Sequence, residues 1–225
     1  MITQLVKENR SCRRFYQDHA VAPEILKECV DLARMSASGA NLQPLKYILS
    51  CDSEKNAEIF SCLAWAGYLK DWPGPAEGER PAAYIVILAD TSISESAGCD
   101  HGIAAQTILL GAREKGLGGC MLGSIDRDAL RDSLNILSQF KILLVLAIGK
   151  PKEQVVMETI GSNDSIRYWR DSDGVHHVPK RKLEDIVLVM MPRPMPFSPP
   201  WATMTTLMVV ERMNICAISR YLGLA

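Results

Sequence analysis

The chain has 225 residues, and its 25 lysine and arginine residues against 26 aspartate and glutamate residues give a net charge of −1 at pH 7. This balance excludes a strong long-range attraction to nucleic acid or to an anionic membrane, so any anion must be bound by local contacts. The seven cysteines form no CxxC pair and are odd in number, which argues against a metal site and a secreted disulfide framework. Residues 1–10 lack the apolar core of a secretion signal, and the longest apolar run, 142–149, is too short to span a bilayer. We therefore expect a cytoplasmic protein.

Apolar periodicity predicts four helices. The first carries its apolar side chains on one face, and Pro23 before it suits a first helical position. Gly116 is expected to end the third. In chain order the predicted helices are residues 24–35, 54–68, 101–116 and 127–134.

Three runs of apolar and β-branched residues predict strands, at 45–51, 83–90 and 141–149. Small and amide residues at 36–44 predict a loop, and the three prolines and two glycines of residues 71–81 predict a mobile surface loop. The order of helices and strands lacks the regular strand and helix alternation of a doubly wound fold. The class is therefore α+β or mixed α/β, of which we expect α+β.

The composition changes near residue 188. The stretch 188–225 holds six of the ten methionines and five of the twelve prolines. Its prolines exclude a helix before about Trp201, whereas residues 206–222 could form an apolar-faced helix that needs a partner surface. We predict a domain at 1–187 and an extension at 188–225, which could be an arm that embraces a dimer, a specific addition or a segment foreign to the domain.

Two basic clusters are candidates for binding an anion. Residues 10–14, RSCRR, precede the first long helix, where a rigid guanidinium can be aimed at a phosphate or a carbonyl. The second cluster is residues 180–182, KRK, which could join the first in a phosphate clamp or could be a solvated tail. His176 and His177 adjoin it, and on an extended segment they would point to opposite sides. The glycines of 116–124 follow a helix and precede an apolar run, which is the reverse of a dinucleotide-binding loop, so they predict a turn into a strand.

Four segments in this order and spacing resemble the flavin-dependent nitroreductase family. They are RSCRRF at 10–15, ASGANLQP at 37–44, the helix and glycine turn at 102–124, and HVPKRKLEDIV at 177–187. The resemblance implies an α+β fold with a central, mainly antiparallel sheet in an intertwined homodimer. It also implies FMN bound at the subunit interface.

The resemblance also assigns cofactor contacts to individual positions. The first arginine cluster would hold the FMN phosphate, the ribityl chain and the pyrimidine edge of the ring, and the loop after the first helix would come from the partner subunit. The stretch after the glycine turn would approach flavin N5 through its backbone, and the second basic cluster would contact the phosphate. The residues are Arg10, Ser11 and Arg13; Ser38, Gly39 and Asn41; Leu122, Gly123 and Ser124; and Lys180, Arg181 and Lys182.

The implied activity is the reduction of nitroaromatic or quinone-type acceptors with electrons from NAD(P)H. A cation such as Arg13 near N1 and C2=O would favour the reduced flavin, which is anionic there. Trp65, Tyr68 and Trp72 are candidates for a lid, although aromatic residues at such spacing also form cores.

Three other interpretations of the function stay open. One is a flavin-binding module without turnover, and another is a different reaction on the same fold, such as reductive dehalogenation or flavin breakdown. A third is a structural protein whose methionine-rich tail binds a partner. Ala37 stands where the family often has proline, and Met121 where an aromatic residue is common, so the pocket wall could differ in shape.

Overall fold

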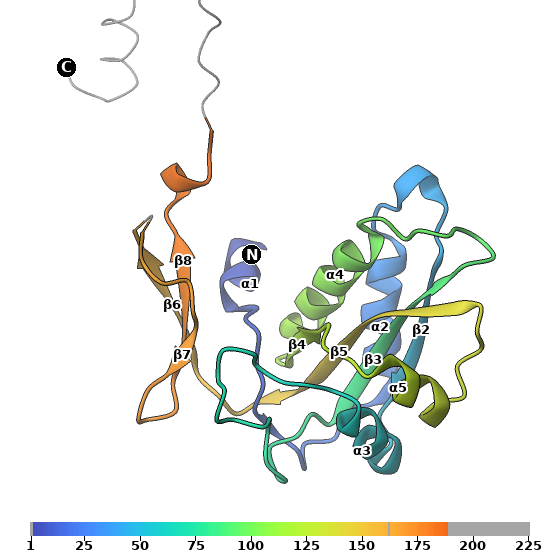
Figure 1. Ribbon diagram of the computed structural model, residues 1–225, viewed down its shortest axis with the longest axis horizontal. Coiled ribbons are helices and arrows are strands. Elements are labelled where there is room, and N and C mark those ends of the chain that lie inside the picture. The colour runs from blue at the N-terminus through green and yellow to red at the C-terminus, as the bar shows by residue number, and fades with distance from the viewer. Residues whose placement is uncertain (1, 162, 189–225) are drawn as a thin grey trace, which may run out of the picture. The chain divides into compact units, whose positions relative to one another are not determined.

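The computed structural model describes residues 2–161 and 163–188. The chain divides into two units, Met1–Lys182 and Leu183–Ala225. Figure 1 shows the helices and strands of the first unit. The helices are α1 Ile2–Glu8, α2 Pro23–Arg34, α3 Ser53–Ser61, α4 Asp100–Glu114 and α5 Arg127–Ser133. The strands are β1 Phe15–Tyr16, β2 Leu45–Ser50, β3 Ala83–Asp90, β4 Gly118–Leu122, β5 Phe140–Pro151, β6 Val155–Ile160, β7 Trp169–Arg170 and β8 His176–Arg181.

The central sheet has the order β1-β5-β3-β2, with β4 also paired to β5, and all of these pairs are antiparallel. Figure 1 shows α2 and α4 on one side of this sheet and α3 and α5 on the other. A hydrophobic core lies on each face of the sheet. The fully buried strand β3 contributes side chains to both cores, because successive side chains of a strand point to opposite faces. Ile85 faces the cluster with α2 and α4, whereas Tyr84 and Val86 face the other cluster. The predicted α+β class is confirmed.

Helices α2 and α4 form as the sequence predicts. Pro23 is the first residue of α2, whose buried Leu26, Cys29 and Ala33 follow a helical period. A Cβ atom at Gly111 of α4 would lie 2.7 Å from Leu32 Cδ1 of α2, so the missing side chain allows the two helices to pack closely. Helix α4 ends before Gly116, which has a φ of +75°.

The predicted helix 54–68 is wrong in its second half, because α3 ends at Ser61. Leu63 forms an isolated bridge with Ile125, and Ala64 N donates to Ser124 O at 3.0 Å. Ala66 then has a φ of +40°, which lies outside the right-handed helical region. Long-range pairing thus overrides the local helical pattern.

A second, three-stranded sheet has the order β6-β8-β7, with β6 parallel to β8. The sequence did not predict it. Its strands are short or half-exposed, and β8 contains Pro179, a residue that weakens a strand prediction. This sheet nevertheless carries the second basic cluster.

Of the second unit the structure describes residues 183–188, which include the 3-10 turn Leu183–Asp185. The predicted helix 206–222 and the role of the extension lie outside the described residues, so they and the boundary near 188 stay predictions. Within the described part of the chain, no helix is both long and apolar enough to cross a membrane.

Candidate functional site

The arginine segment, residues 10–14, lies alongside β4. Ser11 forms a parallel bridge with Gly119, and Cys12 N donates to Gly119 O at 3.0 Å. Strand β4 continues to Leu122, and Gly123 and Ser124 follow. Two of the predicted cofactor segments, distant in sequence, are therefore neighbours.

Arg10 is held against α1 and the second sheet. Its Nη2 donates to Val6 O at 2.7 Å, and its Nη1 lies 3.3 Å from Met157 Sδ in β6. Its Nε is buried and has no partner among the described residues. Burial also lowers the pKa of Arg10 from its ordinary value. An unpaired N–H on a cation is a donor that suits an anionic ligand.

Arg13 is fixed on both sides. Its Nη1 donates to His176 Nε2 at 3.2 Å, and its guanidinium carbon lies 4.9 Å from the centre of the Tyr168 ring. The backbone N–H of Arg13 donates to Glu153 Oε1 at 3.1 Å. Because a guanidinium carries five N–H donors, this arrangement orients the group and leaves donors for a ligand.

The second basic cluster lies at the end of β8. Lys180 follows His176 by two strand periods, so their side chains leave the same face of β8. That face also carries Val178, the register partner of Met157, which contacts Arg10. The first cluster therefore packs against the face of the second sheet that carries Lys180, while Arg181 alternates to the other face. All three residues, including Lys182, are exposed.

The adjacent histidines point to opposite sides, as predicted. His176 is fully buried beside Arg13, whereas His177 contacts Glu158 Oε1 at 2.6 Å and Asp171 Oδ2 at 3.1 Å. These two carboxylates raise the pKa of His177, with the Asp171 hydrogen bond as the main cause.

The loop 36–44 is organised by a carboxylate that the sequence did not single out. Asp100 accepts a hydrogen bond from Ser38 Oγ at 2.6 Å and another from Gly39 N at 2.9 Å. Beyond Gly39, Asn41 has a φ of +55° and Ala40 a φ of +48°. Backbone in this region is costly for residues other than glycine, so it persists where the surroundings impose it, commonly at ligand sites.

Within one chain this loop lies apart from the arginine segment. Figure 1 shows the loop after α2 at one end of that helix, whereas the chain that leads from α1 through the arginine segment enters α2 at its other end. The structure therefore does not bring Ser38, Gly39 and Asn41 together with Arg13 in a single chain.

The stretch after β4 is open to a ligand. Leu122 is buried, whereas Gly123 and Ser124 are exposed. A Cβ atom at Gly123 would meet no atom within 4 Å among the described residues. Ser124 O accepts from Ala64 N, and Gly123 O accepts from Arg127 Nη2 at 3.4 Å, so both carbonyls already have a donor.

The three lid candidates differ in position. Trp65 is 7% exposed and packs 5.6 Å from the Phe60 ring, so it is a core residue. Tyr68 is 48% exposed and packs 4.9 Å from Tyr168, the ring beneath Arg13. Trp72 lies 4.6 Å beneath the Arg170 guanidinium. A lid role for these residues stays a prediction.

A buried cluster of Glu153, Arg170 and His176 lies behind Arg13, and the sequence did not predict it. Glu153 accepts from Arg170 Nη2 at 3.1 Å, and burial raises the pKa of this carboxyl. Burial, followed by Arg13 and Arg170, lowers the pKa of His176 to about 4. Since Arg13 can only donate, His176 Nε2 must accept, and the ring proton sits on Nδ1. That Nδ1 and Arg170 Nε are buried with no partner in the described chain.

We predict that stability decreases as the pH is lowered, because of His176. Its pKa drops from 6.5 to about 4 on folding, so the unfolded chain binds the proton more readily. The contribution is complete above pH 6.5 and is lost as the pH falls toward 4, by about 3 kcal/mol. Denaturant unfolding at several pH values measures it.

His176→Gln is the matched control, because its amide oxygen can still accept from Arg13 but does not titrate. The variant should lose the slope between pH 6.5 and 4. A variant that keeps the wild-type slope would show that another group causes it.

Comparison with known proteins places these features in context. Residues 6–150 match the model of the Nitroreductase family. The MhqN protein of Bacillus subtilis, whose name assigns it provisionally to the NAD(P)H nitroreductases, is 23% identical over 184 residues, which cover 68% of this chain and 89% of MhqN.

Solved structures show the same fold. A nitroreductase family protein of Streptococcus pneumoniae superposes with a TM-score of 0.58 at 18% identity, covering 68% of this chain and 92% of its own. The NADPH:FMN oxidoreductase of Vibrio harveyi, solved with NAD⁺, gives a TM-score of 0.53 at 22% identity, covering 67% of this chain and 68% of its own. The predicted fold, a nitroreductase-like arrangement with an antiparallel sheet, is confirmed.

Proposed function

The chain belongs to the Nitroreductase family, and on that premise we propose that it is an FMN-dependent oxidoreductase that uses NAD(P)H to reduce nitroaromatic or quinone-type acceptors. At the level of the family it is an oxidoreductase. The observation that carries the proposal is the pairing of the arginine segment with β4, because it sets the fixed cation of Arg13 beside the strand that leads to Gly123.

The residues present fit FMN. Arg10 offers a buried N–H without a partner in the described chain, and Arg13 offers donors beyond the one that His176 accepts. The open space at Gly123 lets a flat ring approach the backbone. When bound, FMN would supply the hydride chemistry between nicotinamide and acceptor. The chain itself supplies positive charge, orientation and a flat contact surface.

We assign the phosphate to Arg10 and Lys180 because Arg10 contacts Met157 on the same face of the second sheet that carries Lys180. Ser11 and Arg13 would hold the ribityl chain and the pyrimidine edge, and Arg181 and Lys182 remain candidates for further phosphate contacts. Leu122, Gly123 and Ser124 would present their backbone to the central ring.

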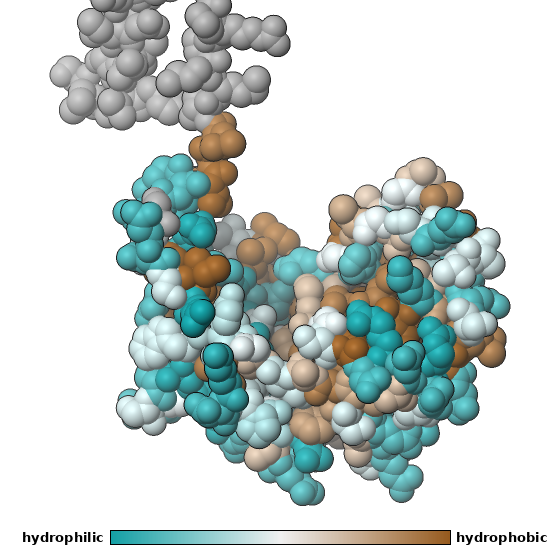
Figure 2. Space-filling model, in the orientation of Figure 1, coloured by the Kyte–Doolittle hydropathy of each residue, from teal (hydrophilic) through white to brown (hydrophobic). Residues whose placement is uncertain are grey.

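A homodimer would complete the site. The loop 36–44 lies apart from Arg13 within one chain, which supports its delivery from a partner. Beside this loop is a hollow of about 530 Å³ whose lining includes the half-exposed Leu42 and Ile103. Figure 2 shows hydrophobic surface over the central sheet between α4 and α5. Apolar surface of this kind is typical of contact between subunits.

The cysteines support a reducing compartment such as the cytoplasm. The described part of the chain contains six of them, and all six are free thiols.

Steady-state kinetics test the proposed activity. With FMN, the full-length protein should oxidise NADH or NADPH at a rate that rises with a nitroaromatic or quinone acceptor. Bound FMN without acceptor-dependent oxidation would instead support a flavin-binding module. Products from a halogenated phenol, or loss of the flavin itself, would support another reaction on the same fold.

A further inference from the structure

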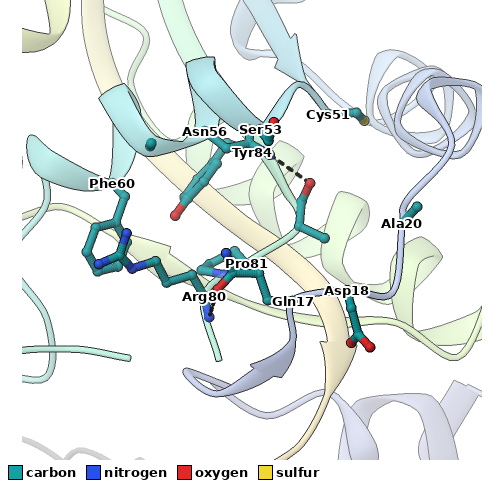
Figure 3. A pocket seen from close by; sticks show the side chains of 12 residues that line it. Gln17, Asp18, Ala20, Cys51, Ser53, Asn56, Phe60, Arg80, Pro81 and Tyr84 are labelled. Carbon is teal, nitrogen blue, oxygen red and sulfur yellow. Dashed lines mark hydrogen bonds between the residues drawn. The ribbon is translucent and has the colours of Figure 1, made fainter. Parts of the chain in front are cut away.

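A partly open cavity of about 250 Å³ lies between α3, the start of β3 and the residues after β1. Its lining includes Gln17, Asp18, Asn56, Phe60, Arg80 and Tyr84. None of the residues assigned to FMN lines it. Figure 3 shows the Tyr84 hydroxyl directed toward the Arg80 side chain and the Phe60 ring.

Tyr84 brings a buried donor to this cavity. The residue is 1% exposed, and its hydroxyl has no hydrogen-bond partner among the described residues. A buried hydroxyl without a partner costs about 1 to 3 kcal/mol, so its retention needs an explanation. Burial raises the pKa of Tyr84, and the phenol therefore stays protonated and can donate.

Arg80 brings a fixed cation. Its guanidinium carbon lies 4.4 Å from the centre of the Phe60 ring, and its backbone N–H donates to Gln17 Oε1 at 3.1 Å. Its Nε is buried and unpaired within residues 2–161 and 163–188. The ion pairs found in those ranges give Arg80 no carboxylate partner. A guanidinium held against a ring by its carbon can still donate its N–H groups to an oxyanion.

The oxygens of both neighbouring amides are already engaged. Asn56 Oδ1 accepts from Ser50 Oγ at 2.8 Å, and Asn56 Nδ2 donates to Ala82 O at 2.8 Å. Gln17 Oε1 accepts from the backbone N–H groups of Gly78 and Arg80. The groups of the cavity that lack a partner in the described chain are thus hydrogen-bond donors, one of them cationic, and a ligand that satisfies them must be a negatively charged acceptor. Asp18 is exposed on the lining and would repel a second negative charge.

We propose that this cavity binds a small monocarboxylate, whose oxygens accept hydrogen bonds from the Tyr84 hydroxyl and the Arg80 guanidinium. The volume lies just below the ~300 to 1,000 Å³ of pockets for drug-sized ligands, so the acid is short. This cavity is separate from the proposed flavin site. If it does not bind a carboxylate, the proposed oxidoreductase function is unaffected.

Saturation-transfer NMR on the full-length protein tests the proposal, with propionate as probe and propionamide as its neutral isostere. Propionate should bind saturably and propionamide at least about tenfold more weakly. Equal binding of both probes, or no saturable binding of propionate, would overturn the proposal. Inorganic phosphate serves as competitor, and displacement of propionate by a lower concentration of phosphate would overturn the choice of a carboxylate.

Two variants locate the site. Tyr84→Phe removes only the hydroxyl and should weaken propionate binding about tenfold, while Arg80→Met should weaken it about tenfold to a hundredfold. Lys27→Gln, which removes an exposed charge on α2, should bind as the wild type does. Tyr84→Phe keeps the ring in the core, so it tests the site even where Arg80→Met fails to fold. Wild-type affinity in Tyr84→Phe would contradict the assignment.

Discussion

Replacing Arg13 with alanine is expected to weaken FMN binding by about 10- to 100-fold, because a hydrogen bond from a charged donor contributes about 1.5 to 3 kcal/mol. The variant should also lower the reduction potential of bound flavin, since it removes a cation that favours the reduced form. Quenching of FMN fluorescence on titration with the full-length protein measures the affinity.

Arg14→Ala is the matched control. Arg14 lies next to Arg13 in sequence, but its Nε and Nη2 both donate to Glu79 at 2.6 Å. Arg14 is the main cause that lowers the pKa of Glu79 to about 2. This carboxylate therefore stabilises the fold above pH 4.5, and its contribution is lost as the pH falls toward 2. Arg14→Ala should cost about 1 to 2 kcal/mol of stability and leave FMN affinity unchanged. Equal and negligible effects of both variants on FMN would show that the cluster is assigned wrongly.

Replacing Gly119 with alanine is expected to destabilise the protein by about 3 kcal/mol or more. A Cβ atom there would lie 2.3 Å from Ala147 O in β5 and 2.8 Å from Leu109 Cδ2 in α4. Backbone on one side and a packed helix on the other leave it no room. Because Gly119 also anchors Ser11 and Cys12, the variant should loosen the cofactor segment. Urea unfolding measures the stability.

Gly123→Ala separates fold from function. The new methyl group would enter open space, so stability should change by less than about 0.5 kcal/mol. The same methyl group would stand where the flavin ring approaches, so FMN affinity should fall. A Gly119→Ala protein as stable as the wild type would contradict the packing account, and unchanged FMN affinity in Gly123→Ala would contradict the assigned contact.

Much of the fold could be predicted because its elements bury continuous or periodic apolar faces. Strand β3 is buried along its whole length, and α2 has one apolar face, so local patterns suffice for both. The end of α3 could not be predicted, since it depends on the bridge between Leu63 and Ile125, far apart in the chain. The second sheet could not be predicted for the same reason, because its half-exposed strands are held by pairing with one another.

Only some residues of the candidate site could likewise be predicted from the sequence. The arginine segment and the glycine turn could be found because their residue types and order are distinctive. Asp100, Glu153 and Arg170 could not, because each acts through a partner that only the fold brings near. Burial of His176 was also hidden, although the two adjacent histidines gave a signal of alternating orientation.

The central claim is that Arg13 and the segments around it hold FMN. An absorbance titration of the full-length protein with FMN, run for the wild type and for Arg13→Ala, tests it most directly. We expect the visible flavin spectrum to shift and saturate at one FMN per chain in the wild type, with Arg13→Ala needing at least about tenfold more FMN for half saturation. A wild-type protein that leaves the FMN spectrum unchanged, or an Arg13→Ala protein that binds FMN as tightly as the wild type, would contradict the account.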